Sequence, residues 1–452
     1  MNKSPLTINP LTSPLLTDLY QFTMMETYLQ TGMDKTAVFE FFTRALPKYR
    51  GFLIAAGLDS VLSFLENLHF TAEEIDYLRQ TGRFSKKLLD YLASFRFNGD
   101  VYALPEGTVC FAGEPLIRVE APIPVAQFVE SRLMNFMHFE TSIASKAARC
   151  CLAAGGKILI DFGLRRAHGA EAGTLAARAA YICGFTGTAT VLAQTLYGIP
   201  IFGTMAHSYI EAVGDEEEAF VNFARTNPNN VTFLIDTYDT LKGAQHAVQA
   251  ANRMTKEGIR TDAVRLDSGD FLSLSKAVRE ILDQNGLPDI KIVASGNLDE
   301  HMIQTLVASR APIDAFGVGT KLDTSEDAPY MECAYKLMEY DGKPKLKKSS
   351  GKATLPGRKQ IMRSFRDGKM VKDLVTLEGD AQEGTPLIKK VMADGRRLAP
   401  TVDLAALAAY TKSQLQALPE NLRQLSEASS YPVEFSPALL HLREKAEQLI
   451  GE

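Results

Sequence analysis

Residues 262–268 read DAVRLDS, a short apolar run that ends in an aspartate and a serine. Strands of a parallel sheet have this composition, because helices cover both faces of such a sheet and the strands are buried on both sides. The polar residues then fall at the carboxyl end of the strand. This stretch therefore predicts one strand of a parallel α/β sheet, with side chains capable of chemistry at its end.

Five other runs share this pattern, and each is followed by a helical pattern. They are KILIDFG (157–163), IPIFGTM (199–205), VTFLIDT (231–237), IKIVASG (290–296) and IDAFGVG (313–319). Successive runs start roughly 25 to 40 residues apart, near the repeat of a βα barrel. A doubly wound open sheet gives the same local pattern. We favour the barrel, because polar residues end nearly every run instead of gathering at one crevice.

The rest of the chain is organised around this region. Residues 1–123 mix helical stretches with short strands between Gly and Pro turns, which predicts an α+β domain. Helical periodicity over 124–154 predicts a bridging helix. We assign residues 155–335 to the barrel. Residues 336–452 are expected to pack back on the N-terminal domain and the barrel, so that the α+β domain contains part of the C-terminal region.

The first helix is expected to begin at Ser13 and Pro14, since serine caps helices and proline suits the first helical position. Apolar residues near helical spacing continue to Gly32, which ends it, and Tyr20 lies on it. The preceding stretch has no apolar segment of signal-peptide length, and no later stretch is long and apolar enough to span a bilayer. We therefore expect a cytoplasmic protein.

Composition narrows the function classes. The 452 residues are 46% hydrophobic and carry a formal net charge of −5, which predicts a soluble globular protein large enough for two domains. A nucleic-acid surface needs a concentrated excess of Lys and Arg and is not expected. An anionic substrate would have to meet locally placed cations. The five cysteines form no CxxC or Cys/His spacing, so the sequence predicts neither a disulfide nor a structural zinc.

If the runs form one barrel, their polar ends form one bowl. Its candidate residues are Asp161, Arg165, Arg166, Thr204, His207, Asp236, Arg265, Asp267, Ser268, Ser295, Asn297, Gly317, Gly319 and Thr320. The arginines suit phosphate or carboxylate groups, and the backbone of GVGTKL (317–322) can hold a phosphate. Asp236, Asp267 and Asp270 could hold Mg²⁺ or sugar hydroxyls; alternatively they cap helices or orient the arginines.

GTMAHS (203–208) places a lone histidine directly after one of the runs. Such a histidine is often structural. The position of His207 in the bowl favours a chemical role, because neutral imidazole can accept a phosphoryl group when a carboxylate fixes its tautomer and cations offset the charge. Asp215 with Glu218 has the pattern of a capping box for the next helix instead of a metal cluster.

Taken together, the motifs resemble one enzyme family. LLTDLYQFTM, DFGLRRAHG, GTMAHS, LIDTYDT, VRLDSGD, SGNLDE, GVGTKL and TLPGRKQ, in this order and spacing, resemble nicotinate phosphoribosyltransferases from about residue 12 to beyond residue 360. The resemblance implies an irregular TIM-like α/β barrel packed with an α+β domain, and a homodimer. It implies synthesis of nicotinate mononucleotide and diphosphate from nicotinate and 5-phosphoribosyl 1-diphosphate in NAD salvage. It also implies Mg²⁺ and coupling to ATP hydrolysis through a phosphohistidine.

The resemblance gives roles to individual residues. It makes His207 the phosphorylated residue, with Thr204 beside the substrate. Arg265 would anchor the substrate, and Asp267 would bind ribose or Mg²⁺. Further substrate-binding residues are expected at Asp236, Ser268 and Gly317.

The pyridine and the 5-phosphate receive their own residues by the same resemblance. Phe162 would stack on the pyridine ring while Arg165 meets the nicotinate carboxylate. Tyr20 of the partner subunit would close the other face of the ring. Gly319 and Thr320 would bind the 5-phosphate.

The sequence fits nicotinate, a carboxylic acid, better than nicotinamide, the corresponding amide. Related amide-using enzymes carry an aspartate in the segment corresponding to GFTGTATVLA, where this sequence has Thr188 and Thr190. Arginine and hydroxyl donors suit nicotinate, because a buried unpaired carboxylate is costly. A nicotinamide-using enzyme, a quinolinate-type enzyme and a catalytically silent metabolite-binding protein remain the alternatives. The sequence assigns no role to His168 or Asn297 and does not identify the residue that orients His207.

Overall fold

A computed structural model of the chain describes residue 9 and residues 11–349, 353–425 and 430–451. Residues 1–8 and 10, part of the stretch expected to lack a signal segment, lie outside the described residues. The chain divides into two compact units. We call them the composite unit (Met1–Ser145 and Tyr330–Glu452) and the parallel-sheet unit (Lys146–Pro329).

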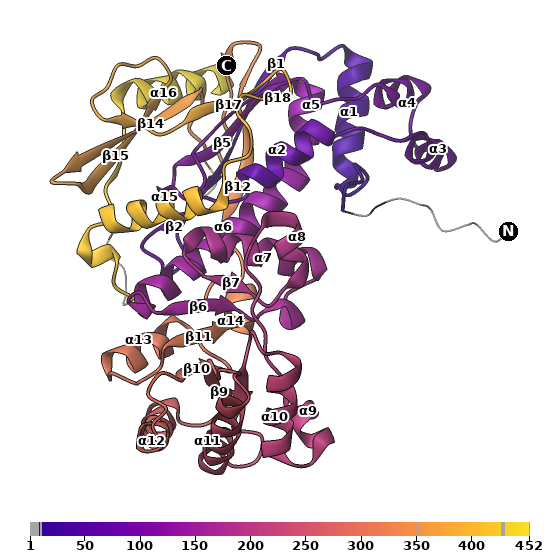
Figure 1. Cartoon of the computed structure of the whole chain (residues 1–452). Coiled ribbons are helices and arrows are strands. Elements are labelled where there is room, and N and C mark those ends of the chain that lie inside the picture. Colours follow the sequence, from indigo (N-terminus) through magenta and orange to yellow (C-terminus); the bar gives the residue numbers. More distant parts are fainter. Residues whose placement is uncertain (1–8, 10, 350–352, 426–429, 452) are drawn as a thin grey trace. The chain divides into compact units, whose positions relative to one another are not determined.

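The parallel-sheet unit is built on short strands, drawn as arrows in Figure 1. Most side chains of these strands are buried. The strands are β6 (Ile158–Asp161), β7 (Gly187–Thr188), β8 (Thr232–Leu234), β9 (Ala263–Leu266), β10 (Lys291–Ser295) and β11 (Ala315–Val318). Their order is β7-β6-β11-β10-β9-β8, and every neighbouring pair is parallel. The expected parallel α/β architecture is confirmed, since five of the six predicted runs each contain one of these strands and only β7 lies outside the runs.

The run at 199–205 is the exception. It forms a single parallel bridge, between Ile201 and Thr188 of β7. Pro200 has no N–H to donate to a ladder, which limits strand formation here. Asn230 Nδ2, just before β8, donates to the Gly203 carbonyl at 2.7 Å. Within the described residues the ladder does not close into a ring, and its order is consistent with an irregular TIM-like domain.

Helices alternate with these strands. They are α6 (Glu130–Ala154), shared with the composite unit, then η1 (Leu164–Arg166), α7 (Ala170–Cys183), α8 (Val191–Tyr197), α9 (His207–Val213), α10 (Glu216–Thr226), α11 (Thr240–Lys256), α12 (Phe271–Gln284), α13 (Glu300–Ala308) and α14 (Thr320–Asp323). Helix α11 contacts β9 and α12 contacts β10. Among the described residues no helix has the length and hydropathy needed to cross a membrane.

In the composite unit, segments from both ends of the chain share one sheet. Its seven strands, in spatial order, are β13 (Lys343–Pro344), β12 (Cys333–Tyr340), β1 (Thr36–Thr43), β5 (Pro115–Pro122), β3 (Asp100–Ala103), β17 (Lys389–Ala393) and β18 (Arg396–Arg397). The smaller sheets are β16 (Thr385–Pro386), β14 (Lys359–Arg366), β15 (Lys369–Leu377) and β19 (Val433–Phe435), and β2 (Leu53–Ile54) with β4 (Val109–Cys110). Strand β12 pairs with β1, so the chain after residue 330 completes the N-terminal sheet.

The helices of this unit correct two expectations. They are α1 (Leu19–Thr31), α2 (Leu58–Asn67), α3 (Ala72–Gln80), α4 (Lys86–Ala93), α5 (Ile123–Phe128), α15 (Leu404–Ala417), η2 (Glu420–Leu422) and α16 (Pro437–Gly451). The first helix begins at Leu19, not at Ser13, because the Ser13 hydroxyl accepts the Leu15 N–H in a preceding turn and donates to Glu74. The single helix expected over 124–154 is two, α5 and α6, separated at Val129.

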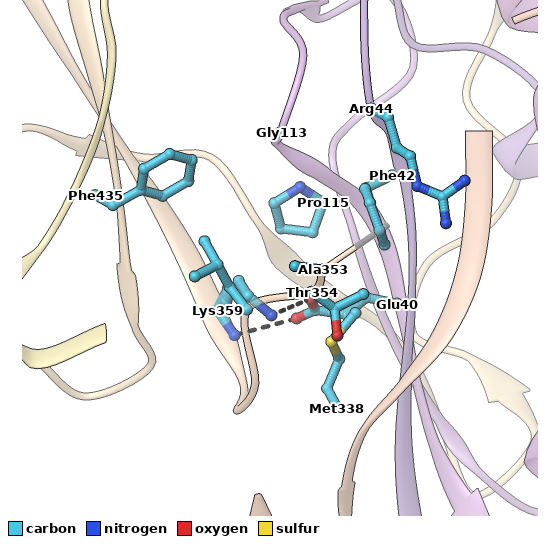
Figure 2. A pocket seen from close by; sticks show the side chains of 11 residues that line it. Glu40, Phe42, Arg44, Gly113, Pro115, Met338, Ala353, Thr354, Lys359 and Phe435 are labelled. Atoms are coloured by element: carbon cyan, nitrogen blue, oxygen red, sulfur yellow. Dashed lines mark hydrogen bonds and ion pairs between the residues drawn. The ribbon is translucent and has the colours of Figure 1, made fainter. Parts of the chain in front are cut away.

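A cavity of about 340 Å³ lies inside the composite unit, lined in part by Phe42, Pro115 and Phe435 (Figure 2). At its wall Lys359 Nζ donates to Glu40 Oε2 at 2.6 Å, and both side chains are at least 96% buried. The pair joins β14 to β1. Its opposite charges satisfy each other inside the core.

Candidate active site

Polar side chains gather at the carboxyl edge of the parallel sheet. Because all neighbouring strands are parallel, the residues at or just after each strand end share one edge. The residues at these ends are Asp161, Phe162, Asp236, Thr237, Asp267, Ser268, Ser295, Gly296 and Gly319. In parallel α/β proteins this edge is where ligands bind.

Asp236 and Asp267 are tied together by hydrogen bonds. Asp236 Oδ2 accepts the backbone N–H of Asp267 at 3.0 Å and the hydroxyl of Ser268 at 2.6 Å. Ser295 Oγ donates to Asp267 Oδ1 at 2.5 Å. The ends of β8, β9 and β10 therefore form one network. Asp236 Oδ1 is buried and has no hydrogen-bond partner among the described residues, so it can accept a bond from a ligand.

His207 is the first residue of α9 and belongs to the same network. Its Nδ1 lies 3.1 Å from the Thr237 hydroxyl, and its Nε2 lies 3.9 Å from Asp267 Oδ2. The side chain is 38% exposed, which leaves the ring accessible to a ligand. Thr237 and Asp267 are thus the residues that orient the imidazole, a role that the sequence left unassigned.

Arg265 lies beside both aspartates. It comes from β9, and its Nη2 donates to the Met205 carbonyl at 3.2 Å. Burial lowers the pKa of the guanidinium, Asp267 and Asp236 raise it, and Arg165 lowers it, so these charges lie within electrostatic reach of each other. The Asp267 carboxylate therefore lies near the His207 ring, and its charge also acts on Arg265. Arg265 Nε is buried and unpaired among the described residues.

Hydrogen bonds join two turns at this edge, the turn after β6 and the turn after β11. The Phe162 N–H donates to the Val318 carbonyl at 2.8 Å, and Arg166 Nη1 donates to Thr320 Oγ1 at 3.1 Å. A Cβ on Gly317 would lie 2.5 Å from the Phe162 ring, so only glycine lets the ring lie there. The segments DFGLRR and GVGT, predicted separately to bind a pyridine and a phosphate, are brought together.

Strand β10 ends in a tight turn against the aspartate network. Gly296 has φ +97°, and a Cβ there would lie 1.9 Å from the Asp267 carbonyl oxygen, so glycine is required. Asn297 follows with φ 53° and is exposed. Asn297 therefore shapes the turn, and the structure gives it no contact with the network.

Other aspartates near strand ends cap helices. Asp270 starts α12 by accepting the Leu272 N–H. Asp215 starts α10 by accepting the Glu218 N–H at 2.9 Å, the half of the expected capping box that the structure shows. Thr204 donates within its own segment, to the Met205 carbonyl at 3.3 Å. None of these bonds joins the aspartate network.

Two residues at this edge were not identified from the sequence. Thr237 follows Asp236 in VTFLIDT, and its place at a strand end was the available signal. Asp323, on α14, is fully buried against the turn at Gly163. Nothing in the sequence distinguishes Asp323 from an ordinary helix residue.

Comparison with models of protein families identifies the family of this chain. The models for the nicotinate phosphoribosyltransferase (NAPRTase) N-terminal domain, the NAPRTase family and the C-terminal domain match residues 15–138, 158–377 and 378–443. The chain belongs to the nicotinate phosphoribosyltransferase family. The family resemblance inferred from the motifs is confirmed.

Relatives support this assignment over nearly the whole chain. A nicotinate phosphoribosyltransferase of Mycobacterium tuberculosis is 47% identical over 432 residues, covering 94% of this chain and 92% of the relative. One from Bacillus subtilis is 43% identical and covers 77% of this chain and 72% of its own length. The crystal structure of human nicotinic acid phosphoribosyltransferase, 27% identical, matches 95% of this chain and 99% of its own with a TM-score of 0.84.

In this nicotinate phosphoribosyltransferase family member, Tyr20 lies on α1 of the composite unit, as expected. It is 44% exposed. Burial and the nearby Glu130 carboxylate raise the pKa of Tyr20 to about 12, so its hydroxyl stays protonated. His168 is exposed between η1 and α7, and the structure gives it no role.

Two carboxylates at this edge could hold a magnesium ion together with ligand phosphates. Among the described residues no group of three or more His, Cys, Asp or Glu side chains is placed to form a metal cage. Mg²⁺ commonly uses one or two carboxylates together with substrate phosphates and water. Asp267 and the unpaired Oδ1 of Asp236 supply such carboxylate oxygens.

Proposed function

We propose that this protein converts nicotinate and 5-phosphoribosyl 1-diphosphate to nicotinate mononucleotide and diphosphate in NAD salvage, and couples this to ATP hydrolysis through phosphorylation of His207. The observation that carries the proposal is that His207 Nε2 lies 3.9 Å from Asp267 Oδ2, at the end of the strand that carries Arg265. A phosphoryl acceptor, a cation and a carboxylate at one sheet edge are the groups that phosphate chemistry requires.

We assign different parts of the substrates to the two groups of residues at this edge, those after β6 and β11 and those after β8 and β9. Phe162, held over Gly317, is proposed to stack on the pyridine, and Arg165 to bind the nicotinate carboxylate. Gly319 and Thr320 hold the 5-phosphate through their N–H groups, aided by Arg166, which already contacts Thr320. Asp236 and Ser268, which are hydrogen-bonded to each other, are proposed to bind the ribose and diphosphate together with Thr204.

The chain's own residues position and stabilise the reacting groups. The carbon that loses diphosphate passes through an oxocarbenium-like state, so little covalent help is needed. Arg265 offsets charge on the leaving diphosphate, and Asp267 accepts bonds from the ribose or from water around the metal. Mg²⁺ supplies further charge neutralisation when bound. Thr237 fixes the rotation of the His207 ring, so that a phosphoryl group is received in one orientation.

Nicotinate, the acid, is the substrate that the side chains at this edge pair best. Segment 184–193 contains no carboxylate to accept an amide N–H. The Asp161 carboxylate, which is hydrogen-bonded to this segment, is 99% buried and accepts bonds from Gly163 N and Thr188 Oγ1. Arg165 is exposed at the same turn. A cationic donor facing the ligand favours nicotinate over nicotinamide.

Diphosphate release measured with nicotinate and 5-phosphoribosyl 1-diphosphate, with and without ATP, tests the reaction. We expect ATP to stimulate the wild-type protein, and His207→Ala to retain basal turnover but lose the stimulation. Equal ATP stimulation in His207→Ala would contradict the phosphohistidine. Turnover of nicotinamide, or of quinolinate with release of carbon dioxide, in preference to nicotinate would contradict the substrate assignment.

A homodimer is part of the proposal, with Tyr20 reaching the partner's site. Helix α8 supports it, since Val191, Leu192 and Leu196 are 53–66% exposed. Apolar patches of this kind mark protein interfaces. Mixing Tyr20→Ala with His207→Ala protein should restore ATP-stimulated turnover, because one site of each mixed dimer is intact. Lack of restoration, with Tyr20→Ala impaired alone, would place Tyr20 in its own subunit's site.

A further inference from the structure

Two buried carboxyl groups lie next to each other behind the turn that carries Phe162. Asp161 ends β6 and is 1% exposed; Asp323 ends α14 and is fully buried. Asp161 Oδ1 accepts the Gly163 N–H at 2.8 Å, and its Oδ2 accepts the Thr188 hydroxyl at 2.6 Å. Both oxygens of Asp323 are buried and receive no hydrogen bond from the described residues.

The Asp323 carboxyl lies directly against the turn. A Cβ built on Gly163 would be 2.1 Å from Asp323 Cγ, so no side chain fits at position 163. The carboxyl groups of Asp161 and Asp323 interact with each other. Asp323 therefore connects the end of β6 with the helix that follows the GVGT segment.

Two adjacent buried carboxyl groups are most stable when one of them keeps its proton, because two like charges at close range repel each other. The elements packed against α14 are η1, which carries Arg165 and Arg166, and α7, which carries Glu171 and Arg178. Of these charged groups, Asp161 has the largest effect on the pKa of Asp323. Burial, followed by the Asp161 charge, raises the pKa of Asp323 well above its usual value.

We propose that Asp323 is a positioning residue: as a neutral acid it donates a hydrogen bond to Asp161 and holds the Phe162–Arg166 turn against the GVGT segment. The Asp161 oxygens keep lone pairs for this bond beside those given to Gly163 and Thr188. Phe162 and Arg165 are thereby fixed relative to Gly319 and Thr320. The identity of the ligands rests on the proposed function, whereas the retained proton does not.

Ionisation of Asp323 would break this connection. When the pair loses its proton to solvent at high pH, two adjacent carboxylates repel each other and the hydrogen bond is lost. The turn then separates from the GVGT segment. The KM values for nicotinate and 5-phosphoribosyl 1-diphosphate should rise together with pH, because one carboxyl pair positions both half-sites.

The proton can be measured without any substrate. Infrared spectra of wild-type protein and Asp323→Asn at neutral pH should differ by the carbonyl stretch of one protonated carboxylic acid. Burial also raises the pKa of Glu114 in the composite unit, but Glu114 is present in both proteins, so its contribution cancels in the difference spectrum. No difference in this band between the two proteins would overturn the proposal.

Variants test the positioning. The amide in Asp323→Asn keeps an N–H donor, so this variant should keep wild-type KM values at neutral pH and lose their rise at high pH. The side chain in Asp323→Leu keeps the volume but donates nothing, so both KM values should rise about tenfold, the effect of roughly one hydrogen bond to a charged group. Asp314→Asn, the same change at the amino end of β11 where Asp314 accepts the Ile292 N–H, should leave them unchanged.

Hydrogen exchange separates this proposal from the proposed function. Amides of residues 162–166 should exchange faster in Asp323→Leu than in wild type and Asp323→Asn, whether or not nicotinate is a substrate. Failure of nicotinate turnover with this exchange pattern intact would refute the reaction alone. Unchanged exchange in folded Asp323→Leu, or identical KM values in all variants, would refute the positioning role.

Discussion

Buried charges in the core of the composite unit and charges at the strand ends of the parallel-sheet unit are arranged in different ways. In the composite unit, opposite charges form buried pairs: Lys359 with Glu40 at 2.6 Å, and Arg363 with Asp373 at 2.6 Å. The parallel-sheet unit has such a pair away from its strand ends, Lys146 with Glu300. At the strand ends of the parallel-sheet unit, like charges adjoin. Asp236 adjoins Asp267, Asp161 adjoins Asp323, and Arg165 lies near Arg265.

We interpret the opposite pairs as structural and the adjacent like charges as groups that bind a ligand. An opposite pair is complete by itself, and its loss is felt in stability. Adjacent like charges destabilise the empty protein but attract a cation or an anion that completes them, which is why such clusters occur at functional sites. At this edge the aspartates suit Mg²⁺ and ribose, and the arginines suit phosphate and carboxylate.

The largest effect is expected from Lys359→Met. The change leaves the Glu40 carboxylate buried without its cation, and removal of one partner of a buried pair costs about 3–5 kcal/mol. The free energy of unfolding, measured by urea denaturation, should fall by that amount. The kcat of the molecules that remain folded should stay near the wild-type value, because the pair lies in the core of the composite unit.

The double variant Glu40→Met with Lys359→Met is the matched control. It replaces both charges by apolar groups, so much of the lost stability should return. A double variant as unstable as Lys359→Met would show that Lys359 acts through other contacts, such as its bond to the Gly357 carbonyl.

Asp267→Asn should have the opposite effect to Lys359→Met: activity should fall while stability stays nearly unchanged. The amide oxygen of the substituted side chain can still accept the Ser295 hydroxyl, but the charge beside Arg265 and His207 is lost. We expect kcat/KM to fall at least about 100-fold, or ~2.7 kcal/mol, with a melting temperature close to wild type. Steady-state kinetics and calorimetry measure the two effects. A clear loss of stability with activity retained would make Asp267 a structural residue like Glu40.

Regular features of the fold could be predicted from the sequence. DAVRLDS and VTFLIDT combine a buried run with polar ends, so both the strand and the edge follow from local composition. Strand β7 was missed because two residues in GFTGTATVLA give no periodicity. The start of α1 was misplaced because Ser13 bonds to Glu74, 61 positions away, a contact that no local rule contains.

The site was predictable where residues follow strands and not where they meet through tertiary contacts. His207, Arg265 and Asp267 could be named, because each lies in a strand-end motif. The bond from Thr237 to His207 depends on how α9 lies beside β8. Asp323 becomes notable only when Gly163 leaves room for its carboxyl. Burial and pairing decide these roles, and a single sequence records neither.

Asp270 should give the smallest effect, although it follows the same strand as Asp267. Its Oδ2 accepts the Ser273 hydroxyl at 2.6 Å and its Oδ1 the Leu272 N–H, so it caps α12. Asp270→Ala should leave kcat/KM within about twofold and lower the melting temperature slightly, as loss of an exposed cap does. Kinetics and calorimetry on the same preparation provide the comparison with Asp267→Asn.

The pH dependence of that small loss gives a sharper test. The hydrogen bond from Ser273, followed by backbone N–H groups, lowers the pKa of Asp270. A carboxyl with a lowered folded pKa stabilises the protein above its unfolded pKa of about 3.9, and this contribution disappears as pH falls through the folded pKa. The melting-temperature difference between wild type and Asp270→Ala should therefore persist at neutral pH and shrink on acidification. If Asp270→Ala instead lost activity as Asp267→Asn does, the aspartates after β9 would act as one group, and hydrogen bonding alone would not separate caps from site residues.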